Sequence, residues 1–304
     1  MKKQQLTVPK KVGLPLEDKI LNVVVYVAMI LLVIVVAYPM IFVLSSSFSS
    51  GRAVTNGWVL LWPVEPSIKG YQMVFDYRII WTGYGNTIYI TVVATTINVI
   101  LTTLAAYPLS RRNMQGRKIY MTLFMITMFF SGGMIPSYIL RLKLGLIGSR
   151  WAVILSGALS VYNMIIMRTF FMNSIPPDLF DAARIDGISD IGYLLKIVIP
   201  LSRAVFAVIV LYYAVAHWNS YFSSMLYLRD RDMYPLQMVL RDILSASNVD
   251  LDQFDDAEIL ASVIGSTDLI KYASIVVSAA PVLVAYPFVQ KFFEKGVMLG
   301  SVKG

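Results

Sequence analysis

Six apolar stretches constrain this chain more than any other feature. A helix needs about 20 predominantly apolar residues to cross the hydrocarbon core of a bilayer. Segments of about that length occupy residues 20–44, 88–109, 119–140, 151–171, 197–216 and 270–290. Of all residues, 57% are hydrophobic and only 14% are charged, and an ordinary soluble domain carries more charge than that. The pattern predicts an all-α, polytopic membrane protein with six transmembrane helices.

These stretches divide the chain into one membrane domain with two tails. We expect an N-terminal tail at 1–19, a transmembrane domain at 20–293 and a C-terminal tail at 294–304. Inside the domain, a loop at 174–196 follows the fourth stretch, and a long external loop at 217–269 follows the fifth. The first apolar stretch is too long for a signal peptide and no small-residue cleavage site follows it, so we interpret it as a retained span.

Basic residues cluster at three places that six spans would put on one side of the membrane. These are the N-terminal tail, the connection at 111–118 and the C-terminal tail. Lys and Arg are enriched in cytoplasmic flanks, which predicts a cell-membrane protein, in a bacterial plasma membrane, with both termini cytoplasmic. The acid-rich loop at 229–268 is compatible with an external position. The net charge of +8 is therefore interpreted as membrane orientation and not as nucleic-acid binding.

The loop at 174–196 begins with the signals of a short helix. Pro176 and Pro177 suit the first turn, where a missing N–H costs nothing, and Asp178 suits the positive end of the helix dipole. Gly187 can adopt the left-handed conformation that ends a helix. About ten residues give a rod of roughly 15 Å, too short to span a membrane. Such a rod can dock on another protein or rest on lipid headgroups, and helix physics alone leaves both alternatives open.

The same loop resembles the "EAA" loop of ABC-importer permeases. That motif has Glu-Ala-Ala, then Gly after three residues, and Ile-x-Leu-Pro after nine more. This sequence has Asp181-Ala182-Ala183, Gly187, Ile197, Ile199 and Pro200 at the matching spacing. It departs by carrying Asp181 in place of Glu and Ile199 in place of Leu, and both changes keep the chemical character. In that family the short helix docks in a cleft of a separate ATPase.

More of the chain resembles the maltose-type carbohydrate permeases, in their LplC/YtcP-like branch linked to complex oligosaccharides. The similarity runs from about residue 15 to the end and includes 132–138, 144–146, 165–171, 217–222, 234–237 and 295–304. One departure is Ile188, where the family usually has Ala. The resemblance implies a type I ABC-importer permease fold and import of sugars, oligosaccharides in particular, by alternating access.

The resemblance also implies partners and site residues. The partners would be a second related permease forming a heterodimer, an ATPase dimer and an extracellular solute-binding protein. ATP and Mg would be bound by the ATPase, with no cofactor in this chain. The residues implied to couple to the ATPase are Asp181, Ala182, Ala183, Asp186, Gly187 and Pro200. Independently, the sequence has no Gly-x-x-x-x-Gly-Lys-Ser/Thr phosphate loop, so the energy source should be another polypeptide.

Aromatic and polar residues cluster at the outer end of the fifth stretch. Sugars are bound by aromatic faces together with hydrogen bonds to hydroxyls, so these residues are candidates for the substrate path. The candidates are Tyr213, His217, Trp218, Asn219 and Tyr221. If the helix continues, Tyr213 and His217 share one face. The alternative is an aromatic belt at the membrane interface, where Trp and Tyr are enriched without any ligand.

Other polar residues lie inside the apolar stretches. We expect Asn98 and Asn163 to bond between helices. We expect Arg168 to reach interfacial water or to pair with an acid such as Asp178 or Asp190. The absence of cysteine, the single histidine and the absence of a carboxylate pair within a span predict no catalytic residues and no metal site.

Three rival functions remain open at this stage. An ion-coupled secondary transporter would have buried acids near mid-membrane, whereas every Asp and Glu here lies in a predicted loop or tail. A non-sugar ABC importer permease would keep the coupling loop and change the substrate. A signalling or structural membrane scaffold would make the loop pattern a coincidence.

Overall fold

A computed structural model describes residues 15–246 and 257–301 of the chain, and every regular element in them is a helix. The all-α prediction is therefore confirmed for this part of the chain. Most of the predicted N-terminal tail, the end of the C-terminal tail and the middle of the predicted loop at 217–269 lie outside the described residues.

Three of the predicted spans appear as long helices. They are α1 (Leu16–Ser47), α4 (Arg78–Ser110) and the part of α15 (Ala257–Ser301) that runs from Gly265 to Pro287. Each is long and apolar enough to cross a membrane. α4 buries a row of polar and small side chains along its length, including Asn86, Thr95 and Asn98, and so is the central helix of the bundle.

The third and fifth predicted spans are each broken by a sharp bend. α5 (Arg117–Phe129) and α6 (Met134–Lys143) meet at 108°. Between them Gly133 has a φ of 89°, a conformation that glycine adopts without steric cost. The segment Asp190–Leu201 meets α12 (Arg203–Trp218) at 85°. The sequence analysis counts one span in each place, and apolar composition alone does not reveal these bends.

The fourth predicted span is also divided. α7 (Arg150–Ile154) is a single short turn, and α8 (Val161–Ser174) has 14 residues. Between them lies Gly157, whose φ of 70° is left-handed. Within the described residues, three helices can cross a membrane by length and composition, or five if each bent pair is one span. The count of six spans therefore stays a prediction.

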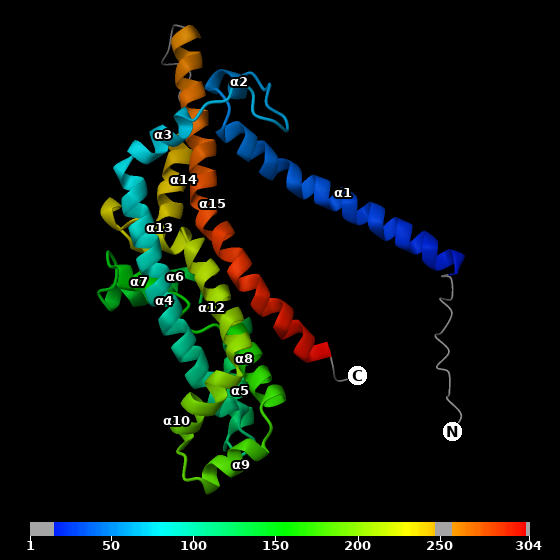
Figure 1. Cartoon of the computed structure of the whole chain (residues 1–304). Coiled ribbons are helices and arrows are strands. Elements are labelled where there is room, and N and C mark those ends of the chain that lie inside the picture. The colour runs from blue at the N-terminus through cyan, green and yellow to red at the C-terminus, as the bar shows by residue number, and fades with distance from the viewer. Residues whose placement is uncertain (1–14, 247–256, 302–304) are drawn as a thin grey trace.

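The helices form one elongated bundle from which α1 departs (Figure 1). The main core lies between α4, α8 and α12, and it continues into the predicted coupling loop through Ala183 and Tyr193. α1 contacts the bundle near its C-terminal end, where Ser45, Ser46 and Ser47 are buried. None of its most apolar window is buried within the described chain.

The two ends of the bundle carry different structures. At one end lie α2 (Gly51–Thr55) and α3 (Lys69–Asp76), and at the other lie α9 (Asp178–Ile185) and α10 (Asp190–Tyr193) (Figure 1). Near the α2 end, the backbones of Gly51 and Gly265 approach so closely that a Cβ on Gly51 would lie 2.7 Å from the Gly265 carbonyl oxygen. Glycine on both helices permits this contact.

The predicted external loop at 217–269 is largely folded where the structure describes it. It contains α13 (Phe222–Tyr227), the short 3-10 helix Arg231–Met233 and α14 (Leu236–Ala246). α14 packs on α4, because Leu236 and Val239 are buried and the Leu236 N–H donates to Thr87 Oγ1 at 2.7 Å. The predicted loop therefore contains packed helices in its described residues, and its external position stays a prediction.

Candidate functional site: the coupling loop and a polar cavity

α9 is built as the sequence predicts. It begins after Pro177 and carries Asp178 and Asp181 in its first turn, where acids interact favourably with the helix dipole. At its other end Gly187 has a φ of 72°. The Ile188 N–H donates to the Ala183 carbonyl at 2.9 Å and the Gly187 N–H to the Arg184 carbonyl at 3.1 Å. This is the Schellman pattern, so the predicted role of Gly187 in ending the helix is confirmed.

α9 has one face turned to the bundle and one turned outward. Ala183 is only 3% exposed, and Phe180 beside it is partly buried against the main core. On the outward face, Ala182 and Asp186 are exposed and Ile185 is 86% exposed, while Asp181, also exposed, lies at the edge where α9 borders a cavity. Four of the predicted coupling residues, Asp181, Ala182, Asp186 and Gly187, are therefore accessible. Ala183 instead anchors the helix, and its burial removes it from any docking surface in this conformation.

Pro200 lies apart from α9, at the bend that leads into α12. The chain from α10 continues through a π-helical turn, Leu194–Val198, into α11 (Ile199–Leu201). Proline has no N–H to donate to the preceding turn, and π turns are common where a helix must absorb such a disruption. Ser202, fully buried, follows and forms the hinge of the 85° bend. Pro200 thus shapes the connection between α9 and α12 and makes no part of the exposed α9 face.

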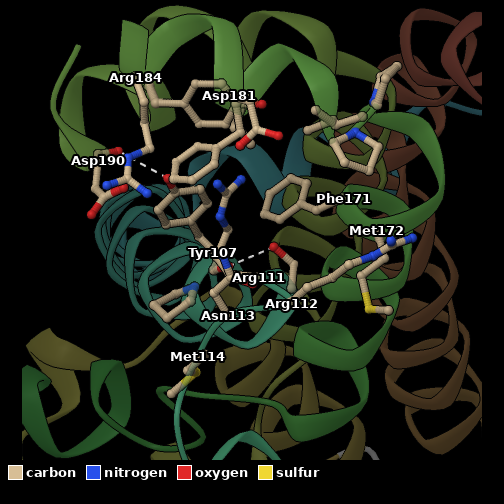
Figure 2. Close-up of a pocket in the computed structure, with 18 of the residues that line it drawn as sticks. Tyr107, Arg111, Arg112, Asn113, Met114, Phe171, Met172, Asp181, Arg184 and Asp190 are labelled. Carbon is tan, nitrogen blue, oxygen red and sulfur yellow. Dashed lines mark hydrogen bonds between the residues drawn. The ribbon is translucent and has the colours of Figure 1, made fainter. Parts of the chain in front are cut away.

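A cavity of about 980 Å³ lies between α9, α10 and the facing ends of α4 and α8. Figure 2 shows Arg111 and Arg112 on the α4 side of this cavity and Asp181, Arg184 and Asp190 on the other. The Tyr107 hydroxyl of α4 donates to the Asp190 carbonyl oxygen at 3.1 Å (Figure 2). α9 is therefore not packed flush against the bundle along its whole length.

Arg168 of α8 does not pair with a loop acid in the described residues. Its Nε donates to the Leu109 carbonyl oxygen at 2.9 Å, in the last turn of α4. A cation at the C-terminal end of a helix satisfies a free carbonyl and interacts favourably with the helix dipole. Of the two expected alternatives, pairing with Asp178 or Asp190 is therefore not found in the described residues, and access to interfacial water stays a prediction.

A second cavity, of about 350 Å³, lies between α4, α8 and α12. Tyr213 and His217 of α12 line it, one turn apart on the same buried face as predicted. The Tyr213 hydroxyl hydrogen-bonds to Thr102 Oγ1 at 2.7 Å and accepts the Ser160 N–H at 3.0 Å. This tyrosine therefore holds α4 and the start of α8 to α12 at one wall of the cavity.

The other three substrate-path candidates lie elsewhere. Trp218 is half-buried, and its Nε1–H donates to the Ser278 carbonyl of α15 at 3.3 Å. Asn219 caps α12 and its Nδ2 donates back to the Val215 carbonyl at 3.0 Å. Tyr221 is exposed and makes an edge contact with Phe222. None of the three lines either of the two cavities. Of the five candidates, only Tyr213 and His217 therefore lie together at one cavity.

Asn98 and Asn163 also line the second cavity, and the sequence-based reasoning did not count them as candidates. Asn98 donates to the Gly157 carbonyl at 3.1 Å, which agrees with the expected bond between segments. Its Oδ1, however, is buried without a hydrogen-bond partner. The lining residues include no Asp, Glu, Lys or Arg. The feature of the sequence that could have identified them as candidates is the position of both asparagines in the middle of predicted spans, where unpaired polar groups are costly.

A comparison with models of known protein families identifies one that matches this chain. The family model for the "Binding-protein-dependent transport system inner membrane component" matches residues 98–299. This range includes the coupling loop and all residues that line the two cavities.

Relatives of known name and a solved structure each match most or all of this chain. The polygalacturonan/rhamnogalacturonan transport system permease protein YtcP of Bacillus subtilis (strain 168) is 39% identical over 289 residues, covering 95% of this chain and 100% of the relative. Protein LplC of the same organism is 37% identical over 266 residues, covering 88% and 89%. A crystal structure of a bacterial ABC transporter involved in the import of the acidic polysaccharide alginate contains a chain 34% identical to this one. The two superpose with a TM-score of 0.82 over 93% of this chain and 100% of that one.

Proposed function

Because this chain belongs to the family of binding-protein-dependent transport system inner membrane components, we propose that it is the permease subunit of an ATP-driven oligosaccharide importer. It works by alternating access in the plasma membrane, with both termini in the cytoplasm. Its partners are a related second permease, an ATPase dimer that binds ATP and Mg and an extracellular solute-binding protein. The substrate class is supported by the relatives named for polygalacturonan, rhamnogalacturonan and alginate.

The observation that carries this proposal is the outward face of α9. A short, capped helix at one end of the bundle presents Ile185, 86% exposed, among Ala182, Asp181 and Asp186. An isoleucine this exposed at the end of the bundle contributes little to the fold of this chain. Its burial against a partner contributes about 1.5–3 kcal/mol. In this proposal the face docks on the ATPase, and Gly187 holds the geometry of its end.

Reconstitution of the complete complex in liposomes tests the docking face. Ile185→Ser should reduce both co-purification of the ATPase and substrate-stimulated ATP hydrolysis, by roughly 10-fold or more if 1.5 kcal/mol of docking energy is lost. Ile68→Ser is the matched control, because Ile68 is 59% exposed and precedes α3 at the opposite end of the bundle (Figure 1). Equal effects of the two substitutions would reject α9 as the ATPase contact.

We also propose that the polar cavity between α4, α8 and α12 contacts the oligosaccharide during passage. It offers neutral hydrogen-bonding groups, and the unpaired Asn98 Oδ1 is an acceptor for a sugar hydroxyl. His217→Ala should lower uptake of uronic-acid or neutral oligosaccharides supplied with the binding protein, while the ATPase still co-purifies. Asn219→Ala, outside the cavity, is the control. If uptake were unchanged in His217→Ala, the proposed contact between this cavity and the oligosaccharide would be rejected, and its lining residues would have a structural role alone.

A further inference from the structure

Arg111 is the first residue after α4, and its side chain enters a group of aromatic rings. Its guanidinium carbon lies 3.3 Å from the ring centre of Phe180 in α9, well inside the range of about 6 Å over which a ring face attracts a cation. Tyr193 of α10 and Tyr107 of α4 lie farther out, with ring centres at 5.1 Å and 5.7 Å. Figure 2 shows Arg111 pointing from the α4 side toward the segment that carries Asp181. One side chain thus joins three separate helices.

The rings around Arg111 are themselves held in place. Phe180 and Tyr193 meet edge to face at 5.2 Å and 81°. Tyr193 is 1% exposed, and the Tyr107 hydroxyl is bonded to the Asp190 backbone. Within the described residues no ion pair joins Arg111 to a carboxylate. Its favourable contacts therefore come from ring faces. A lysine ammonium is also attracted to a ring face, but only the planar guanidinium can stack on it.

The position of this contact gives it a mechanical consequence. The cavity of about 980 Å³ leaves part of α9 without direct support from the bundle. Ala183 is small, so Phe180 is the large side chain through which α9 reaches the end of α4. We propose that Arg111 is a positioning residue that locks the coupling helix α9 to the second span α4, so that displacement of α9 by the ATPase moves α4. This inference rests on the proposed function, because it assumes that α9 is the element the ATPase displaces.

Two substitutions separate stacking from charge. Arg111→Lys keeps the positive charge at the end of α4 and removes the planar group that stacks. Phe180→Leu keeps an apolar side chain and removes the ring. The matched control is Arg112→Lys, because Arg112 is exposed and turned away toward Met172 (Figure 2). Arg184 of α9 also approaches the Phe180 ring, at 5.9 Å, so Arg184→Lys tests whether that longer contact contributes.

The measurement is the number of ATP molecules hydrolysed per sugar imported, in liposomes that hold the complete complex with its binding protein. Phe180→Leu should raise this ratio by about 2- to 30-fold, the range that loss of one cation–π contact gives. Arg111→Lys should raise it by a smaller factor, because the lysine ammonium keeps part of the attraction to the ring and loses the stacking. The double variant should be no worse than Phe180→Leu alone, because both substitutions act on the same contact. The ATPase should still co-purify, since the outward face of α9 is unchanged.

The outcomes divide cleanly. If the unsubstituted complex showed no substrate-stimulated ATP hydrolysis, the proposed function itself would fail. If that complex couples normally and Arg111→Lys leaves the ratio at the value of Arg112→Lys, the positioning role is refuted. A loss of assembled complex in Arg111→Lys with an unchanged ratio in the remainder would also refute it, because the contact would then serve stability alone. Additive effects in the double variant would show that Arg111 and Phe180 act separately and would equally overturn the proposal.

Discussion

Gly187 allows a test in which backbone strain is the only variable. Its φ of 72° is left-handed, and no atom lies within 4 Å of the position that a Cβ would take. Gly187→Ala therefore introduces no clash. The left-handed conformation costs an L-residue about 1–2 kcal/mol. The two hydrogen bonds that close α9 at this point contribute roughly 0.5–1.5 kcal/mol each. The penalty is thus comparable to the free energy that these two bonds contribute. It raises the ratio of frayed to closed α9 ends by a factor of about 5–30.

The assay is ATP hydrolysis stimulated by substrate and binding protein, measured per assembled complex. We expect Gly187→Ala to reduce the stimulation severalfold and Gly187→Asn to reduce it less, because Asn tolerates the left-handed conformation. Gly57→Ala is the matched control, with a φ of 70° and equally open surroundings at the other end of the bundle. If both Ala substitutions had the same effect on stimulation, or if Gly187→Ala had none, the geometry of this helix end would not matter for coupling.

Two further predictions concern the stability of the bundle, measured as thermal unfolding in detergent. Gly51→Ala should lower the melting temperature by several degrees, because its Cβ would lie 2.7 Å from the Gly265 backbone oxygen. Gly85→Ala, in an open position on α4, is the control and should leave the melting temperature unchanged or raise it slightly. Tyr213→Phe removes a hydroxyl with two hydrogen-bond partners and should lower the free energy of unfolding by about 1–3 kcal/mol. A melting temperature equal to that of the unsubstituted protein would contradict this and would show that water replaces these bonds.

Local signals predicted the coupling loop well. Proline at the start, acids in the first turn and glycine at the end each act within one helical turn, so their effect is readable from neighbouring residues. The outward exposure of Ala182 and Ile185 and the burial of Ala183 are different. They depend on which side of α9 meets α4, a contact between segments about 70 residues apart, and no local pattern carries that information.

The bends and the substrate candidates show the same limit. Apolar composition identifies the segment around Gly133 as membrane-embedded, but it does not report the sharp turn that the backbone makes there. Trp218 and Tyr213 looked equivalent in sequence because both are aromatic residues of one helix. In the structure Tyr213 lines the cavity and bonds to Thr102 of α4, whereas Trp218 lies outside the cavity, packs against Tyr84 of α4 and bonds to Ser278 of α15. Helical periodicity placed Tyr213 with His217 correctly, and tertiary packing decided the rest.

The separation of α1 from the bundle has a consequence for its stability in the bilayer. α1 is the most apolar of the candidate spans and buries none of its apolar window within the described chain, so it can partition into lipid without any protein neighbour. α4 buries Asn86 and Asn98, whose Nδ2 groups donate to the carbonyls of Asp232 and Gly157 later in the chain, so these bonds form only once those segments are in place. α1 therefore needs no protein neighbour to be stable in the bilayer, whereas α4 gains its full stability there only when later segments pack against it.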